Sequence, residues 1–170
     1  MMYLLDANVF IQAKNLHYGF DFCPGFWDWI DEATANGRVA STREVLDELI
    51  AGDDDLSQWA RARTASMFRA TDEHVLASLR QVSSWAVGAG YEQSAVSTFF
   101  QGADYYLVGH AHAYEHVIVT HEVPSPSTKK LKIPDACVAM GVRYLSTYTM
   151  LRQERVRLVL PPQQRTLVGA

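Results

Sequence analysis

The N-terminal stretch Tyr3-Leu4-Leu5-Asp6 is a short apolar run that ends in a carboxylate. Its consecutive apolar residues, with no polar residue between them, predict a strand that is buried on both faces. The run Val117-Ile118-Val119-Thr120 has the same character, is rich in β-favouring residues and leads into His121-Glu122. Strands of this kind are typical of a parallel sheet that helices cover on both sides. The two runs therefore indicate a central parallel sheet with acidic residues at the ends of two strands.

The rest of the chain alternates between helical and extended patterns. Apolar residues at helical spacing predict helices over 9–14, 26–35, 42–50, 103–115 and 135–144, and an interrupted helical region over 56–101. Further short strands are expected at 39–40, 131–133 and 156–160. Ser41-Thr42-Arg43-Glu44 has the pattern of a capping box at the start of its helix. This alternation predicts an α/β fold: a three-layer α/β/α sandwich with a mostly parallel central sheet and an extended helical region.

Length and composition indicate an ordinary globular protein. A chain of 170 residues with 48% hydrophobic and 20% charged residues predicts one domain over residues 1–170. No stretch approaches the roughly 20 apolar residues of a membrane-spanning helix, so no membrane association is expected. The N-terminus reaches Asp6 without a basic segment, which predicts a cytoplasmic protein. Cys23 and Cys137 have no metal-binding or disulfide spacing and are expected to be free thiols.

Two acidic residues stand where a charge is costly to bury. At about 100° per residue, Asp104 shares an apolar helical stripe with Leu107, Val108 and Ala111, so its carboxylate should point inward. The helix dipole favours a negative charge in the first turn, which explains the residue type but not this direction. Asp6 has two interpretations: it is the N-cap of the next helix, or it presents oxygen atoms to a divalent cation or a phosphate.

Other acidic residues are open to a structural or a functional interpretation. In the helix at 42–50, the capping box gives Glu44 a structural role, whereas Asp47 and Glu48 both flank the apolar stripe, and helix geometry does not choose between them. Glu122 either opens a polar loop or belongs to a site at a strand end. Asp135, after Pro134, is well explained as a residue of a helix start.

Four stretches together resemble the PIN-domain nucleases, and most closely the VapC-type toxins of bacterial toxin–antitoxin pairs. In chain order they are Leu4-Leu5-Asp6-Ala7-Asn8-Val9-Phe10-Ile11, Val45-Leu46-Asp47-Glu48-Leu49, Ala103-Asp104-Tyr105-Tyr106-Leu107-Val108-Gly109-His110-Ala111 and Val119-Thr120-His121-Glu122. Each stretch alone is a weak signal. Their order, and their places at a strand end, a helix, a helix start and a second strand end, make the resemblance fairly specific.

The resemblance implies a site made of four acidic residues. Carried over position by position, the catalytic residues and metal ligands are Asp6, Glu48, Asp104 and Glu122. The resemblance also implies supporting roles for Asn8 and Thr120, and it allows Asp135 to share the fourth role. Glu122 departs from the family pattern, which more often has aspartate after Thr-x, and its extra methylene changes the reach to a metal.

The implied activity is that of a hydrolase: a metal-dependent endoribonuclease that leaves 5′-phosphate and 3′-hydroxyl ends. Oxygen-only ligands suit Mg²⁺ or Mn²⁺, and such an ion can activate water and neutralise the scissile phosphate. The implied partners are an RNA substrate and an antitoxin protein, and a homodimer is compatible with the family. Packed carboxylates also repel one another, so at least one should have a raised pKa when no metal is bound.

Candidates for holding the substrate are few. Lys129 and Lys130 follow the Pro-Ser loop and are expected to contact phosphate, although a solvated loop explains them equally well. Among the aromatic residues of 18–29 we expect mainly core packing, with Tyr18 as a residue that faces RNA. His112 and His116 share a helical face, but no H-E-x-x-H pattern accompanies them, so a structural zinc site is the weaker reading.

Two other classes of function remain compatible with the sequence. One is a catalytically silent PIN-like binding module, and the other is a phosphotransfer or phosphatase α/β domain, for which Asn8 in place of a second aspartate is unfavourable. The net charge of -4, from 15 Lys and Arg against 19 Asp and Glu, argues against a broad basic surface for nucleic acid. The excess of acidic over basic residues is four, the same number as the acids implied to bind metal. Bound cations would offset these four charges and leave a balanced surface, so RNA binding should be weak without metal.

Overall fold

The computed structural model describes residues 2–159. Its centre is an all-parallel sheet in the order β3-β2-β1-β4-β5. The strands are short: β1 Tyr3–Leu5, β2 Val39–Thr42, β3 Phe68–Arg69, β4 Val117–Val119 and β5 Arg143–Leu145. In the central strand β1, Leu4 is paired with Ala40 on one side and with Ile118 on the other. Since the strands are parallel, the residues that follow β1 and β4 lie at the same edge of the sheet.

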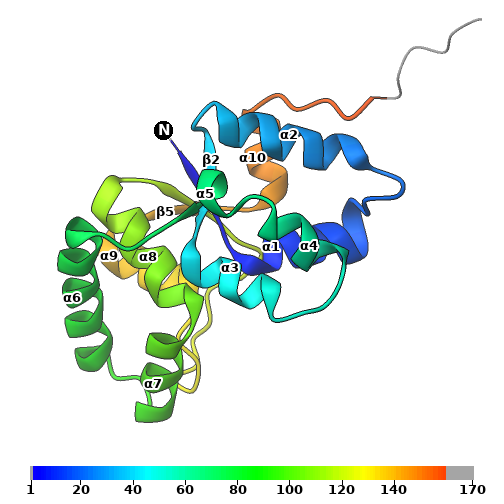
Figure 1. Cartoon of the computed structure of the whole chain (residues 1–170). Coiled ribbons are helices and arrows are strands. Elements are labelled where there is room, and N and C mark those ends of the chain that lie inside the picture. Colours follow the sequence, from blue (N-terminus) through cyan, green and yellow to red (C-terminus); the bar gives the residue numbers. More distant parts are fainter. Residues whose placement is uncertain (1, 160–170) are drawn as a thin grey trace, which may run out of the picture.

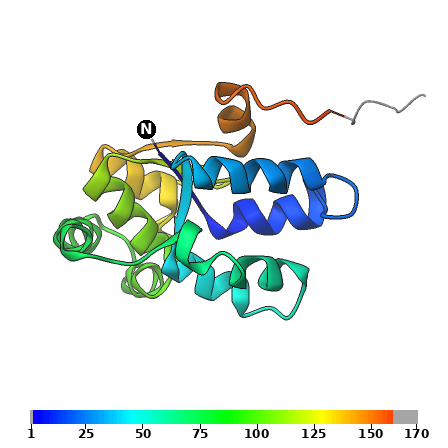
Figure 2. The same ribbon diagram turned by 45° about the horizontal axis from the view of Figure 1, so that its top comes forward.

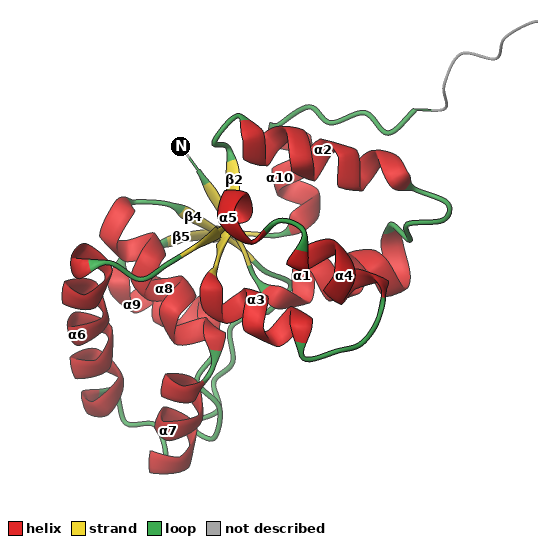
Figure 3. Cartoon of the chain, in the orientation of Figure 1, coloured by secondary structure: helices red, strands yellow, loops and turns green. Residues whose placement is uncertain are grey.

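Helices cover both faces of the sheet. Figures 1 and 2 show α1 and α2 on one side and α8 and α9 on the other, with α6 on the outer side of α8. The bounds are α1 Ala7–Gln12, the π-helix η1 Ala13–His17, α2 Pro24–Ala35, α3 Arg43–Ile50, α4 Asp55–Arg61, α5 Thr64–Met67, α6 Glu73–Gly88, α7 Gln93–Gln101, α8 Ala103–Tyr114, α9 Ile133–Met140 and α10 Thr147–Gln153. In Figure 3 the strands lie at the centre of the molecule between these helices. The predicted three-layer α/β/α sandwich with an extended helical region is confirmed.

The aromatic residues of 18–29 belong mainly to the core or pack against it, as expected, whereas Phe22 is 67% exposed. Phe26 and Trp27 are buried. The ring of Tyr18 stacks on Phe26 with ring centroids 4.4 Å apart, and the indole N–H of Trp27 donates to the backbone oxygen of Tyr18 at 2.6 Å. Trp59 of α4 closes the cluster with its ring centroid 4.9 Å from that of Trp27. The first part of the extended helical region is therefore anchored to the N-terminal helices.

The C-terminal third differs from the sequence prediction. Helix α9 ends at Met140 because Gly141 takes a left-handed conformation with φ 68°, and the chain then forms β5, where we expected the helix to continue. The predicted edge strand at 131–133 is wrong, because Ile133 begins α9. The predicted strand at 156–160 is also wrong over 156–159, which form no regular element, and residue 160 lies outside the described residues. Within the described chain, none of the helices has the length and apolar character needed to cross a membrane.

The predicted capping box at the start of α3 is wrong as well. Ser41 lies in β2, and its hydroxyl donates to the backbone oxygen of Leu5 at 2.6 Å. Thr42 is the N-cap, and its hydroxyl accepts from the N–H of Val45 at 3.4 Å. Glu44 therefore has no capping role. The β2 strand extends two residues further than predicted and takes up the residues that were expected to begin the helix.

Gly109 of α8 lies against Leu79 of α6 with no room for a side chain, which leads to a prediction about stability. A Cβ atom at this position would lie 2.9 Å from Cγ of the buried Leu79. Gly109→Ala should therefore lower the free energy of unfolding by about 1–3 kcal/mol through overpacking. Gly88→Ala is the matched control, because a Cβ there meets nothing within 4 Å, and it should stabilise α6 by about 0.5–1 kcal/mol. Urea unfolding of both variants tests the packing, and equal effects of the two substitutions would contradict it.

Candidate active site

Asp6 is fixed at the carboxyl end of the central strand. Its backbone N–H donates to the oxygen of Val119 at 3.0 Å, which continues the β1–β4 pairing past the end of β1. The residue is only 2% exposed, and Oδ2 accepts from the hydroxyl of Thr120 at 2.8 Å. Burial, together with the charges of Glu122 and Glu48, raises the pKa of Asp6 from 3.8 to about 6, although the bond from Thr120 acts in the opposite direction. Asp6 is thus a buried carboxylate in an acidic environment.

Asp104, in the first turn of α8, carries the most strongly perturbed carboxylate of this group. The helical pattern predicted that its side chain points inward; it is partly buried, lines a cleft and lies near enough to the other acids for their charges to act on it. Its carboxylate accepts no hydrogen bond from any residue of 2–159. Burial raises its pKa to about 7, and the charges of Asp6, Glu122 and Glu48 add to this effect, whereas Lys130 opposes it. A carboxylate with several like charges around it and no donor is a position that a cation would stabilise.

Glu48 and Glu122 are each tied to a backbone donor through one oxygen. Oε1 of Glu48 accepts from the N–H of Ala103 at the start of α8, at 3.2 Å, and this contact distinguishes Glu48 from its exposed neighbour Asp47. Oε2 of Glu122 accepts from the N–H of Ile133 at the start of α9, at 2.9 Å, and Oε1 lies 3.8 Å from Nζ of Lys130. Each glutamate thus contacts a helix start near the sheet edge. The second oxygen of Glu48 has no hydrogen-bond partner among the described residues, and that of Glu122 faces Lys130.

These acids open onto a cleft of about 450 Å³. Three of the four predicted acids line it, while Asp6 lies behind them. Polar groups from α7 and from the loop before α9 complete the walls: Asn8, Ser94, Thr98, Lys129 and Lys130. Asn8, Lys129 and Lys130 were predicted from the sequence. Ser94 and Thr98 were missed, and their i, i+4 spacing on one face of α7 was the available signal.

Three other sequence candidates lie outside the cleft. Oδ1 of Asp135 accepts from the N–H of Ser125 at 3.3 Å, and its other oxygen is buried without a partner within the described chain. Tyr18 lies against Phe26 and borders a separate hollow near α10. The histidines do not gather around a metal: His112 pairs with Ser78 at 2.8 Å, and His121 pairs with Thr147 at 3.1 Å.

The four acids offer oxygen ligands for a metal ion. Over residues 2–159, no three Asp, Glu, His or Cys side chains lie close enough together to enclose an ion as they stand. The hydrogen bonds to Asp6, Glu48 and Glu122 explain this spacing, since each holds a carboxylate against a protein donor. The chemistry of the set nevertheless fits a hard cation, because every donor is an oxygen and the carboxylate of Asp104 has no other partner. The residues fit Mg²⁺ or Mn²⁺ better than Zn²⁺, which prefers histidine and cysteine.

Solved structures of toxin–antitoxin complexes have a similar fold. A chain of VapBC2 from Rickettsia felis, solved with a promoter DNA fragment, has a TM-score of 0.55 and 14% identity, covering 86% of this chain and 98% of that one. VapBC-1 from nontypeable Haemophilus influenzae gives a TM-score of 0.55 and 16% identity over 86% and 98% of the two chains. FitAcB from Neisseria gonorrhoeae gives 0.52 and 20% over 85% and 96%. These likenesses confirm the PIN-like fold that the sequence resemblance predicted.

Comparisons of sequence give a family without an activity. No curated protein sequence is significantly similar to the chain. A family model described as a domain of unknown function, DUF4411, matches residues 3–158. This match spans all five strands and all four candidate acids. The chain therefore belongs to the DUF4411 family.

Proposed function

We propose that this protein is a divalent-metal-dependent endoribonuclease and the toxin of a toxin–antitoxin pair. The observation that carries the proposal is the state of Asp104, a mostly buried carboxylate without a donor that is surrounded by the charges of Asp6, Glu48 and Glu122. Perturbed carboxylates that share one cleft mark functional sites more often than structural ones. The proposal is supported by the position of the cluster beyond the carboxyl ends of β1 and β4, and by the resemblance of its four sequence stretches to those of the PIN-domain nucleases.

The side chains have distinct roles in this proposal. Asp6, Glu48, Asp104 and Glu122 would hold Mg²⁺ or Mn²⁺, which when bound supplies a water of lowered pKa and offsets charge on the phosphate. The hydroxyl of Thr120 fixes the orientation of Asp6, and the N–H of Ala103 fixes that of Glu48. Because no ion is enclosed as the carboxylates stand, Glu48 and Glu122 would turn their second oxygens toward it.

In this proposal, residues at the rim of the cleft bind the RNA. Lys129 and Lys130 lie on the loop before α9 and would contact the phosphate backbone, while Asn8, Ser94 and Thr98 offer neutral hydrogen-bonding groups. Lys130 is 3.8 Å from Glu122 and is therefore partly neutralised before RNA arrives. Glu122 would be one of the residues that hold the ion, and Lys130 beside it would be available to the phosphate backbone of the RNA.

An antitoxin partner is supported by the fold comparison. The similar structures are described as VapBC and FitAB assemblies, two of them with DNA, so chains of this shape occur in complexes with a second protein. We extend this to the present chain as part of the proposal. The gene beside the one that encodes this protein is the simplest place to look for a small DNA-binding partner.

A cleavage assay tests the proposal. The full-length protein should cut labelled transfer, messenger or ribosomal RNA in the presence of Mg²⁺ or Mn²⁺, and the products should carry 5′-phosphate and 3′-hydroxyl ends. EDTA should abolish cleavage, and excess Mn²⁺ should restore it. Cleavage that persists in EDTA would contradict the metal-dependent chemistry. An absence of cleavage for every RNA class, with Mn²⁺ bound to the protein, would favour the silent binding module.

A further inference from the structure

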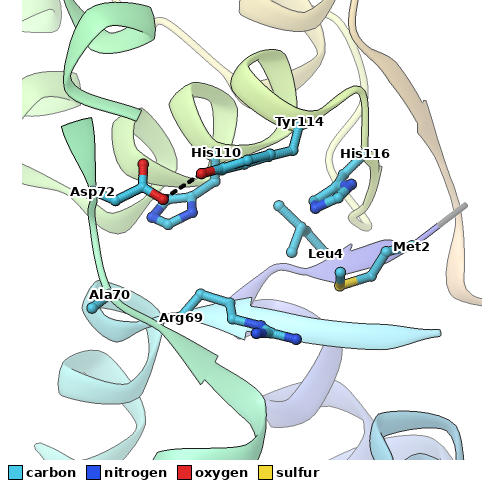
Figure 4. A pocket seen from close by; sticks show the side chains of 8 residues that line it. All are labelled: Met2, Leu4, Arg69, Ala70, Asp72, His110, Tyr114 and His116. Carbon is cyan, nitrogen blue, oxygen red and sulfur yellow. Dashed lines mark hydrogen bonds between the residues drawn. The ribbon is translucent and has the colours of Figure 1, made fainter. Parts of the chain in front are cut away.

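A second cavity, of about 440 Å³, lies on the same face of the sheet as α8 but apart from the acidic cleft. Figure 4 shows it between the start of the chain, the end of β3 and the last turns of α8, which contribute Met2 and Leu4, Arg69, and His110 and Tyr114, respectively. The four candidate metal ligands and Lys130 do not line it. The cavity is therefore a separate place on the molecule, and the proposed nuclease chemistry does not account for its polar groups.

Arg69 brings a positive charge to this cavity that the described chain does not neutralise. Its side chain belongs to an exposed residue, and within residues 2–159 no carboxylate oxygen lies within 4.0 Å of its guanidinium nitrogens. Asp72 also lines the cavity and is ionised, because its hydrogen bonds keep its pKa below the usual value. One of its oxygens accepts from the hydroxyl of Tyr114 and the other from the N–H of Val75 at 3.0 Å, so neither is paired with Arg69. A guanidinium in such a position is available for an anion.

The imidazole rings of His110 and His116 line the same cavity and have few hydrogen-bond partners. His110 is only 3% exposed, yet its ring has a single weak partner, the hydroxyl of Thr71 at 3.5 Å. The half-buried ring of His116 makes no hydrogen bond to any described residue. Burial, assisted by the charge of Arg69, keeps the pKa of His116 below its usual value, and burial lowers that of His110 to about 4. Both rings are therefore neutral at pH 7, and each has an N–H to donate.

The rest of the wall is apolar or aromatic. Met2 and Ala70 supply aliphatic surface, whereas Leu4 borders the cavity but is only 1% exposed. The rings of Tyr114 and His116 lie nearly parallel, at 22° with centroids 5.7 Å apart, and present flat surface beside the charged group. An inorganic anion alone would leave this half of the cavity uncovered. A ligand that fills it needs a flat, apolar part as well as a negative group.

We propose that this cavity binds a nucleoside monophosphate, with the phosphate on Arg69 and the base against the wall of Tyr114 and Met2. The guanidinium can donate two parallel hydrogen bonds to phosphate oxygens, and the neutral imidazoles of His110 and His116 can add one each. The volume lies within the range of small-molecule sites. The phosphate can belong to a free nucleotide or to the 5′ end of a nucleic-acid strand, which share this chemistry.

The test is calorimetric titration of the full-length protein, without added metal, with AMP, adenosine and inorganic phosphate. AMP should bind at least about tenfold more tightly than adenosine or inorganic phosphate, because only AMP uses both halves of the cavity. Arg69→Gln should weaken AMP binding by about tenfold or more, whereas Arg80→Gln, on the exposed surface of α6, should leave it unchanged. The imidazole NMR signals of His110 and His116 should shift on addition of AMP.

Further experiments distinguish binding in this cavity from binding in the acidic cleft. Asp104→Asn should bind AMP as the wild type does, so failure of the nuclease proposal would leave this one intact. A 5′-phosphorylated deoxyoligonucleotide that binds as AMP does assigns the cavity to strand ends, and binding of AMP alone assigns it to free nucleotides. The proposal is overturned if AMP does not bind, if Arg69→Gln binds it normally, or if binding is lost in Asp104→Asn. Because Arg69 is exposed, circular dichroism should confirm that its variant folds.

Discussion

Asp104→Asn should lower the rate of RNA cleavage by at least about a thousandfold while leaving the protein folded. Bound metal contributes several kcal/mol of transition-state stabilisation, and about 1.4 kcal/mol corresponds to a tenfold change in rate. Asp104 is the acid with no donor of its own among the described residues, so it has no structural bond to lose. The amide is nearly the same size and carries no charge, so it removes the repulsion from Asp6 and its neighbours. Single-turnover cleavage with saturating Mn²⁺ measures the effect.

Asp47→Asn is the matched control for this substitution. Asp47 precedes Glu48 on α3, is exposed and does not line the cleft, so its variant should cleave RNA at the wild-type rate. Without metal, Asp104→Asn should have a melting temperature at or above that of the wild type at pH 8. A variant that retains cleavage within tenfold would remove Asp104 from the site. Growth arrest that survives the substitution would favour a protein that acts by binding a partner.

The two strand ends of the candidate site were predictable from the sequence. The runs before Asp6 and before Thr120 are apolar enough to be recognised as buried strands, and a parallel sheet brings their ends together without knowledge of any loop. Asp104 was predictable for a similar reason, because helical spacing alone directs it inward. The family resemblance was needed to choose Glu48 over Asp47, and the structure gives the physical basis, the bond from Ala103 to Glu48.

Other features depend on contacts between segments that are distant in the chain. The short strand β5 is part of the sheet because Arg143–Leu145 pairs with β4, although its sequence reads as the end of a helix. Thr42, and not Ser41, caps α3 because Ser41 is used by Leu5 in the neighbouring strand. The cavity at Arg69 joins residues from three segments, and no local pattern marks it. Such features depend on which distant segments come into contact, and the local sequence pattern does not specify those contacts.

The metal-free protein should lose stability as the pH rises from about 4 to about 7. Folding raises the pKa of Asp6 from 3.8 to about 6 and that of Asp104 to about 7. Between these values the two folded carboxyls bind more protons than they do in the unfolded chain, so their contribution to the free energy of unfolding is full below pH 4 and falls through this window. Buried His110, whose pKa is lowered to about 4, acts in the opposite sense and offsets part of the fall. The decrease should be on the order of 3 kcal/mol, or roughly 6–12 °C in melting temperature for a chain of this size. Thermal unfolding in EDTA from pH 4 to pH 8 measures it.

Mn²⁺ should reverse this loss, because a divalent cation favours the ionised carboxylates that the empty site disfavours. At pH 8 and a concentration about 100 times its dissociation constant, Mn²⁺ should add about 2.7 kcal/mol to the free energy of unfolding. In the Asp6→Asn/Asp104→Asn double variant, both the pH-dependent loss and the rise with Mn²⁺ should disappear. Asp47→Asn should keep both. If the double variant gains as much from Mn²⁺ as the wild type, the ion binds elsewhere and the four acids are not its ligands. In the folded protein, burial and like charges raise the pKa of Asp6 and of Asp104, and the double variant removes both carboxyls. If the variant still loses stability as the pH rises, other titratable groups cause that loss.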